Sequence, residues 1–216
     1  MSRAPGRLGV GRLRPGEQDL LRRMYDAYLE EITSFGASYR RGSEGRWEYR
    51  PGPDGRWKPD HLPYWLETGP DHQILLLRAA REVVGFAMVG VRPAQWMSPG
   101  RDACIAEFYV VPEARRRGFG EAAARRIFDR FPGRWEVCEV PGNAPAIAFW
   151  RRTVGRYTGD RFEELESRGG PAQHFTSVAP RQRPTRPARK APAPPGAAPR
   201  PRATRRSRGG ARAPRR

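Results

Sequence analysis

The sequence has few of the residues from which metal sites and disulfide frameworks are built. Its 216 residues include two cysteines, Cys104 and Cys138, which form no CxxC pair, and three scattered histidines, His61, His72 and His174. These residues indicate neither a zinc site nor a disulfide framework, and we expect no metal. No apolar run approaches the roughly 20 residues of a membrane span, so we expect a soluble, cytoplasmic protein without membrane contact.

Lysine is scarce, and acidic residues are missing from the end of the chain. The formal net charge is +18, yet residues 181–216 hold 13 basic residues and no acid, whereas residues 1–180 carry 28 basic and 23 acidic side chains, a net charge of +5. The Arg/Pro/Ala-rich end has nothing to bury. We therefore predict one folded domain over residues 1–180 and a disordered tail over residues 181–216. The tail lacks aromatic residues for stacking on bases, so we expect at most a weak contact with nucleic acid through it.

The first third of the chain combines a regular and an irregular part. Residues 7–35 begin as a short alternating strand, pass a Pro-Gly turn and continue as an amphipathic helix. Residues 36–60 have no periodicity and are predicted to form a long loop. Because its aromatic residues need burial or a partner, we expect this loop and the following segment 62–68 to form a wall beside a substrate.

The rest of the domain alternates strands and helices. A helix ending at Phe128 and the strand 134–140 after it form a βαβ-like unit, so the strands on either side of that helix should be parallel. A second helix over 143–157 and a final hairpin follow. Before these elements, residues 72–79, 82–93 and 102–112 form three strand-like runs, which we predict to pair as an antiparallel meander.

Two glycines stand between a strand and a helix in VVPEARRRGFGEAAARRIF, residues 110–128. At a helix N-terminus, unpaired backbone N–H groups and the helix dipole both favour a negative charge. Gly118 and Gly120 allow a tight bend and a close approach of the ligand to the backbone. This pattern predicts a site for a diphosphate.

Three kinds of phosphate-containing ligand were considered for this turn: a nucleotide held by a P-loop, a dinucleotide and coenzyme A. A P-loop would need GxxxxGK[ST], which is not in the sequence. The dinucleotide fingerprint is formally matched by Gly118, Gly120 and Ala123, with Glu136 and Glu139 at a tolerable distance for a ribose contact. However, an antiparallel meander precedes this turn, and only about 40 foldable residues follow the next strand, too few for a dinucleotide fold. Coenzyme A is the third candidate.

The segment VVPEARRRGFG, residues 110–120, resembles the acyl-CoA-binding motif [R/Q]xxGx[G/A] of the GNAT family of N-acetyltransferases. Residues 143–150, NAPAIAFW, resemble the family's second motif, NxxAxxFY. Within the family, the chain is most similar to a group of predicted acetyltransferases that share RRRGxG and AFWRR patterns. The resemblance extends over about residues 8–178.

This resemblance implies both a fold and an activity. The fold is of the mixed α/β (α+β) class, with a mostly antiparallel central sheet, one parallel, splayed strand pair, and helices on both faces. The activity is transfer of an acetyl group from acetyl-CoA to a primary amine by direct attack in a ternary complex. The acceptor is a small-molecule or protein amine, and family analogy alone suggests a homodimer.

The resemblance also implies a role for each motif residue. The backbone of Tyr109, Val110 and Val111 would pair with the pantetheine arm, Asn143 would bond to it, and the Val110 N–H would stabilise the oxyanion. Asn143 is equally well explained as a helix cap. The residues implied to hold the diphosphate are Arg115, Arg116, Arg117, Gly118, Phe119 and Gly120. The second motif adds Phe149 and Trp150, of which Trp150 is interpreted as packing.

The amine must lose a proton, and the departing thiolate must gain one. Glu107 lies in the otherwise apolar strand ACIAEFYVV and is the candidate base; the alternative is a strand glutamate paired with an arginine. The tyrosine that often serves as the acid in this family is replaced by Trp150. Tyr157, a loop tyrosine or water could supply the proton instead, or the chain could bind CoA as a regulatory module without turnover. Cys138, if buried, should be inert.

Overall fold

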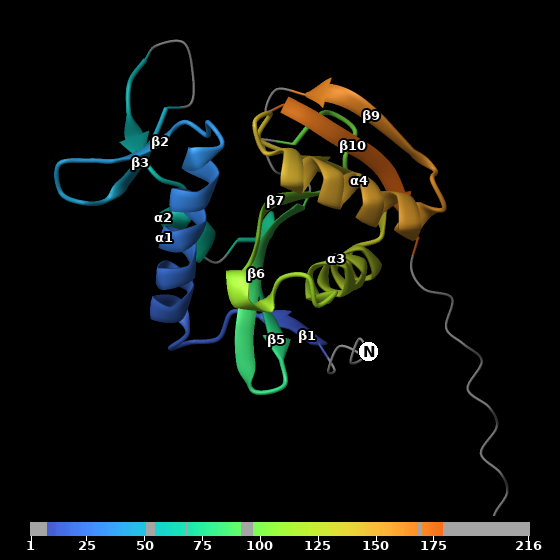
Figure 1. Ribbon diagram of the computed structural model, residues 1–216, viewed down its shortest axis with the longest axis horizontal. Helices are drawn as coiled ribbons and strands as arrows, with labels where there is room; N and C mark the ends of the chain where they lie inside the picture. Colours follow the sequence, from blue (N-terminus) through green and yellow to red (C-terminus); the bar gives the residue numbers. More distant parts are fainter. Residues whose placement is uncertain (1–7, 51–54, 68, 92–96, 168–169, 179–216) are drawn as a thin grey trace, which may run out of the picture. The chain divides into compact units, whose positions relative to one another are not determined.

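The computed structural model describes residues 8–50, 55–67, 69–91, 97–167 and 170–178 (Figure 1). The predicted tail over 181–216 lies outside the described residues. The strands are β1 Leu8–Arg12, β2 Tyr39–Arg41, β3 Trp47–Tyr49, β4 Lys58–Pro59, β5 His72–Ala79, β6 Glu82–Val91, β7 Ala103–Val110, β8 Gly133–Cys138, β9 Phe162–Ser167 and β10 Gly170–Ser177. The helices are α1 Gln18–Ser34, α2 Leu62–Leu66, α3 Phe119–Arg130 and α4 Ala144–Thr158.

Seven strands form the central sheet in the order β1-β5-β6-β7-β8-β10-β9. The pairs of this sheet are antiparallel except for β7 and β8, which run parallel because α3 connects them. The predicted meander, the parallel pair and the final hairpin are confirmed. The fold is therefore a mixed, mostly antiparallel sheet of the expected class.

Helices cover both faces of this sheet (Figure 1). The apolar residues of α1 recur at helical spacing and pack on β5, β6 and β7. On the other face, α3 and α4 pack on β8 and β10 around Phe128, Trp135 and Phe175. The buried positions of α3 include Ala123 and Ala124, whose small side chains let the helix lie close to the sheet.

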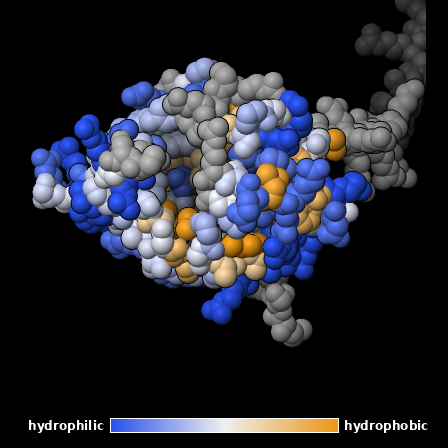
Figure 2. Space-filling view, turned by 90° about the horizontal axis from the view of Figure 1, so that it is seen from above, coloured by the Kyte–Doolittle hydropathy of each residue, from blue (hydrophilic) through white to orange (hydrophobic). Residues whose placement is uncertain are grey.

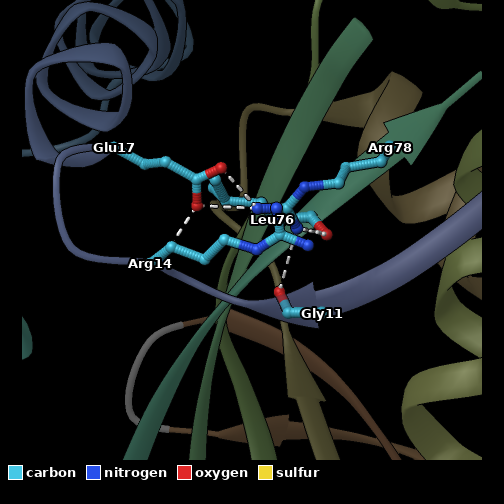
Figure 3. A network of polar contacts seen from close by, with 5 residues as sticks. All are labelled: Gly11, Arg14, Glu17, Leu76 and Arg78. Atoms are coloured by element: carbon cyan, nitrogen blue, oxygen red, sulfur yellow. Dashed lines mark hydrogen bonds and ion pairs between the residues drawn. The ribbon is translucent and has the colours of Figure 1, made fainter. Parts of the chain in front are cut away.

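A polar network fixes the start of α1 against the sheet (Figure 3). The guanidinium of Arg78, in β5, donates to both carboxylate oxygens of Glu17 at 2.8 and 2.7 Å and reaches the Gly11 carbonyl oxygen at 3.5 Å. Glu17 also accepts from the Arg14 N–H at 2.8 Å. The hydrogen bonds from Arg78 hold the pKa of Glu17 below its usual value, so this carboxylate is ionised at neutral pH. The network ties the residue that precedes α1 to strand β5.

The prediction of a long irregular loop over residues 36–60 was wrong for its described part. Strands β2, β3 and β4 form a separate antiparallel sheet, in which Tyr39 lies opposite Tyr49 and Arg40 pairs with Glu48 at 2.9 Å. Trp47 is buried, and its indole N–H donates to Asp26 in α1 at 2.9 Å. Strands of two or three residues between Gly and Pro are too short to give a periodic pattern.

Hydrophilic residues cover most of the face seen in Figure 2, with small groups of apolar residues among them. In the described part of the chain, no helix is long and apolar enough to cross a membrane.

Candidate active site

The site begins where β7 and β8 separate. The two strands pair only where Ala103–Ile105 lie beside Trp135–Val137, so the rest of β7 has an open edge on that side. The Val111 N–H donates to the Val84 carbonyl oxygen at 3.0 Å. Because successive N–H groups of a strand point to opposite sides, the Val110 N–H points away from β6 and towards this open edge. The parallel pair that the family resemblance implied is therefore present, and the two strands separate beyond Ile105.

A one-residue bulge in β7 decides which face Glu107 occupies. Val89 in β6 lies opposite Ile105, and Met88 lies opposite Glu107. Ala106 between them is the extra residue of a β-bulge. Regular alternation would put Ile105 and Glu107 on the same face, but Ile105 packs in the core below α3 and α4, whereas Glu107 points towards α1.

Glu107 meets a tyrosine from α1. The Tyr28 hydroxyl donates a short hydrogen bond to the Glu107 carboxylate. Burial raises the pKa of Glu107 to about 7, although the hydrogen bond from Tyr28 opposes this shift. A carboxyl group with this pKa is divided between its acid and base forms at neutral pH, which suits a general base. The alternative was that Glu107 pairs with an arginine. In the structure, Glu107 instead accepts its hydrogen bond from Tyr28.

A cavity of about 290 Å³ adjoins Glu107. It lies between strands β7 and β8 and the segments around β2 and α2. The aromatic side chains that line it are those of Tyr39, His61, Tyr64 and Trp65. Tyr39, Tyr64 and Trp65 belong to the segments 36–60 and 62–68 that were expected to form an aromatic wall, and they do line this cavity; that a substrate lies beside them stays a prediction. Burial lowers the pKa of His61, which keeps this imidazole neutral.

A second carboxylate faces the cavity from β8. Glu136 accepts from the Ser98 N–H at 3.2 Å and contacts the His174 Nε2 atom at 2.7 Å. Burial alone would raise the pKa of Glu136, but the hydrogen bonds from Ser98 and His174 lower it below the usual value. Cys138 also lines the cavity, and burial raises the pKa of its thiol to about 12, so the thiol is protonated and inert.

The predicted phosphate turn has an unusual backbone. A 3₁₀ turn, Pro112–Ala114, follows β7, and the chain then takes left-handed conformations at Arg116, with φ of +57°, and at Gly118, with φ of +79°. Gly118 is the residue that caps α3. Glycine adopts this conformation without the steric cost that a side chain brings. The glycine at this position is thus explained by local geometry.

The first turn of α3 presents unpaired donors. The N–H groups of Phe119 and Gly120 have no partner within the helix, as in every helix N-terminus. A Cβ atom at Gly120 would lie 3.2 Å from the ring of Phe149, which stacks on Phe108. The absence of a side chain at Gly120 therefore lets the Phe149 ring pack close to the first turn of α3. This geometry fits a diphosphate at the start of α3.

Arg115 has a different environment from the other two arginines. Its guanidinium donates to both Glu31 carboxylate oxygens at 2.8 and 2.6 Å and to the Val110 carbonyl oxygen at 2.7 Å, and its own N–H donates to Pro112. Arg115 thus ties the turn to α1, and its groups are already engaged. Arg116 and Arg117 are exposed, so they are the arginines whose guanidinium groups can reach a ligand.

The second motif is placed partly as expected. The Asn143 side chain accepts from the Ala146 N–H at 3.1 Å, which makes it the N-cap of α4. Trp150 is buried against Phe108 and Phe128, as a packing residue.

Tyr157 is not brought to the cavity beside Glu107. Its hydroxyl donates to Asp129 at 2.9 Å, and its ring packs on Phe128 and Phe175. Burial and Asp129 raise the pKa of Tyr157 to about 12. The residue belongs to the far end of α4.

Three site residues were missed from the sequence or given another role. Tyr28 occupies one of the regularly spaced positions of α1 and looks like any core residue of an amphipathic helix. His174 is a single histidine in a strand. Glu136 was considered only for a ribose contact, although a glutamate between the apolar residues Trp135 and Val137 is a usable signal for a buried carboxylate.

Comparisons with known proteins agree with this geometry. The family model for the acetyltransferase (GNAT) family matches residues 40–155, more than half of the chain. No match was found among curated protein sequences.

Solved structures with a similar fold include an acetyltransferase from Thermus thermophilus, with 16% identity, a TM-score of 0.52, and coverage of 80% of this chain and 97% of that one. Another is described as histone acetyltransferase HPA2 and related acetyltransferase, from Corynebacterium glutamicum, with 11% identity, a TM-score of 0.55, and coverage of 80% and 98%. At these identities the likeness concerns the fold. The family match together with the splayed strands and the glycine turn leads to one conclusion: the chain belongs to the GNAT family and is an acyl-CoA N-acyltransferase.

Proposed function

We propose that the chain transfers an acetyl group from acetyl-CoA to a primary amine by direct attack, with Glu107 as the general base. The observation that carries this proposal is the position of Glu107 on the cavity wall, three residues before the Val110 N–H at the open edge of β7. The amine gives its proton to Glu107 as the new C–N bond forms, and the Val110 N–H donates to the oxyanion.

The residues around α3 fit the co-substrate. The N–H groups at the start of α3, next to Gly118 and Gly120, would hold the diphosphate, with Arg116 and Arg117 adding charge. The open edge of β7 at Val110 would pair with the pantetheine arm, and the amide NH₂ of Asn143 would add a donor. Arg115 holds the turn to α1 through its hydrogen bonds with Glu31 and does not bind the phosphate groups.

The proposed reaction does not need the tyrosine that Trp150 replaces in the second motif. A thiol with an ordinary pKa near 8.5 is a moderate leaving group at neutral or slightly basic pH. In this proposal the C–S bond breaks, CoA leaves as the thiolate, and the thiolate takes a proton from water.

The test is a calorimetric titration of the full chain with acetyl-CoA, with NADH and ATP in parallel, followed by measurement of free CoA release with a panel of amines. We expect binding of acetyl-CoA alone, with micromolar affinity, and CoA release that depends on the amine. Binding of NADH, or of none of the three, would contradict the proposal. The buried Trp150 favours a second function, a CoA-binding module; acetyl-CoA binding without CoA release for any amine or peptide would support that function.

A further inference from the structure

Two walls of the cavity carry a carboxyl group, that of Glu136 and that of Glu107, of which the Glu107 group is partly ionised at neutral pH, since its pKa is about 7. Glu107 comes from β7 and Glu136 from β8, so the two carboxylates belong to the two strands that separate here. Glu136 is buried, and its two oxygens are held by the Ser98 N–H and by His174. This carboxylate cannot turn away from the cavity without losing both hydrogen bonds.

Two further acids stand behind the aromatic wall. Asp71 accepts from the Tyr64 hydroxyl at 2.6 Å and from His72, and Asp60 accepts from the Leu62 N–H at 2.6 Å. Their field adds to that of the two glutamates. A cationic or neutral amine can enter this field, whereas an acceptor with a carboxylate group would be repelled.

The opposite wall is apolar and aromatic. Trp65 is buried, with its ring 5.9 Å from that of Tyr64 in an edge-to-face arrangement. The hydrogen bond to Asp71 fixes the Tyr64 ring. Rigid aromatic rings bind an aromatic or alkyl body by apolar contact, and they bind an ammonium group by cation–π attraction.

The cavity is also small. Its volume of about 290 Å³ lies just below the range for small-molecule pockets, about 300–1,000 Å³. An acceptor of about a dozen non-hydrogen atoms, the size of one ring with a short chain, matches this volume in order of magnitude.

We propose that the acceptor is a compact aralkylamine without a carboxylate group, with its ring against Tyr64 and Trp65 and its amine between Glu107 and Glu136. This inference rests on the proposed acetyl transfer and narrows its substrate class.

The test compares matched acceptors that differ by one carboxylate: tyramine with tyrosine, and phenethylamine with phenylalanine. The full chain is assayed for CoA release at saturating acetyl-CoA. We expect kcat/KM for each amine to exceed that of its amino acid by at least about tenfold. Equal or higher values for the amino acids would overturn the inference, as would acetylation of a peptide N-terminus in preference to all four compounds. In both cases the acetyltransferase function stands, whereas failure to bind acetyl-CoA would remove the function itself.

The variant Glu136→Gln tests the part that charge has in this selection. We expect the ratio of kcat/KM for tyramine over tyrosine to fall at least about threefold, because the carboxylate of tyrosine meets one charge fewer. Glu163→Gln, at an exposed position of β9, removes the same charge outside the cavity lining and should leave the ratio unchanged. A general loss of structure would lower both rates together, so an unchanged ratio in Glu136→Gln would overturn the assignment.

Discussion

Tyr28 in α1 donates its hydroxyl hydrogen bond to Glu107 in β7, across 79 positions of sequence. The bond joins the helix on one face of the sheet to the candidate base. It stabilises the ionised carboxylate against the cost of burial. The Glu107 group is thereby kept near the pKa at which a base works best at neutral pH.

Replacing the base should affect turnover and not binding. Glu107→Gln keeps the size and the hydrogen-bonding shape of the side chain but cannot accept the amine proton. We expect kcat to fall by about 10²–10⁴ at neutral pH, with the Kd for acetyl-CoA unchanged. Steady-state rates and calorimetric titration of the same preparation check this; a pH–rate profile like that of the wild type would return Glu107 to a structural role.

Removing the Tyr28 hydroxyl should move the pH profile. The wild-type activity should rise with pH around 7, as Glu107 ionises. In Tyr28→Phe the ionised form loses a hydrogen bond, so the pKa of Glu107 rises and the midpoint of kcat/KM should shift to higher pH. The matched control is Tyr25→Phe on the same helix, whose buried hydroxyl makes no hydrogen bond within the described part of the chain; the midpoint of this variant should stay in place. A lower rate at every pH with no shift would contradict the positioning role.

The phosphate turn should tolerate only residues that suit its backbone. Gly118→Val places a β-branched residue at φ of +79°, and Gly120→Val puts methyl groups against the Phe149 ring and into the ligand space. We expect each to weaken acetyl-CoA binding at least about tenfold by calorimetry, whereas Gly118→Asn, which accepts left-handed conformations, should lose less. Near-normal affinity in both valine variants would refute the diphosphate assignment.

Stability should fall as the pH rises. Burial raises the pKa of Glu139 to about 8 and that of Glu107 to about 7, both above the ordinary glutamate value. The folded state therefore holds protons that the unfolded chain has released, and this stabilisation is lost as the pH rises through these values. Chemical denaturation should show the free energy of unfolding falling by several kcal/mol from about pH 5 to about pH 8 and levelling off above that, since a pKa that is higher by one in the folded state corresponds to about 1.4 kcal/mol. Glu139→Gln should flatten the curve; an unchanged slope would mean that Glu139 ionises normally.

Tyr157 should matter for stability more than for chemistry. Tyr157→Phe removes the hydrogen bond to Asp129 and should lower the free energy of unfolding by about 1 kcal/mol. Because the hydroxyl lies outside the cavity, CoA release should stay within about twofold of the wild type. A loss comparable with that of Glu107→Gln would show that Tyr157 is the acid after all.

The sequence by itself determined the features that depend on neighbours in the chain. The order of strands and helices follows from hydrophobic periodicity, and the turn at Gly118 and Gly120 follows from a strand, two glycines and a helix in succession. Glu107 was recognisable as a carboxylate inside an apolar strand. Each of these signals extends over fewer than about 20 residues, within the reach of pattern analysis.

Only the tertiary structure decided which distant residues complete the site. The bulge at Ala106 shifts the alternation of side chains in β7 and turns Glu107 towards Tyr28. The Arg115 guanidinium donates hydrogen bonds to Glu31, 84 positions away in the sequence. The pairing of Glu136 with His174 likewise depends on the register of β8 and β10. These contacts form because the packing of α1 and the strand registers bring the groups together, and no local pattern encodes that packing.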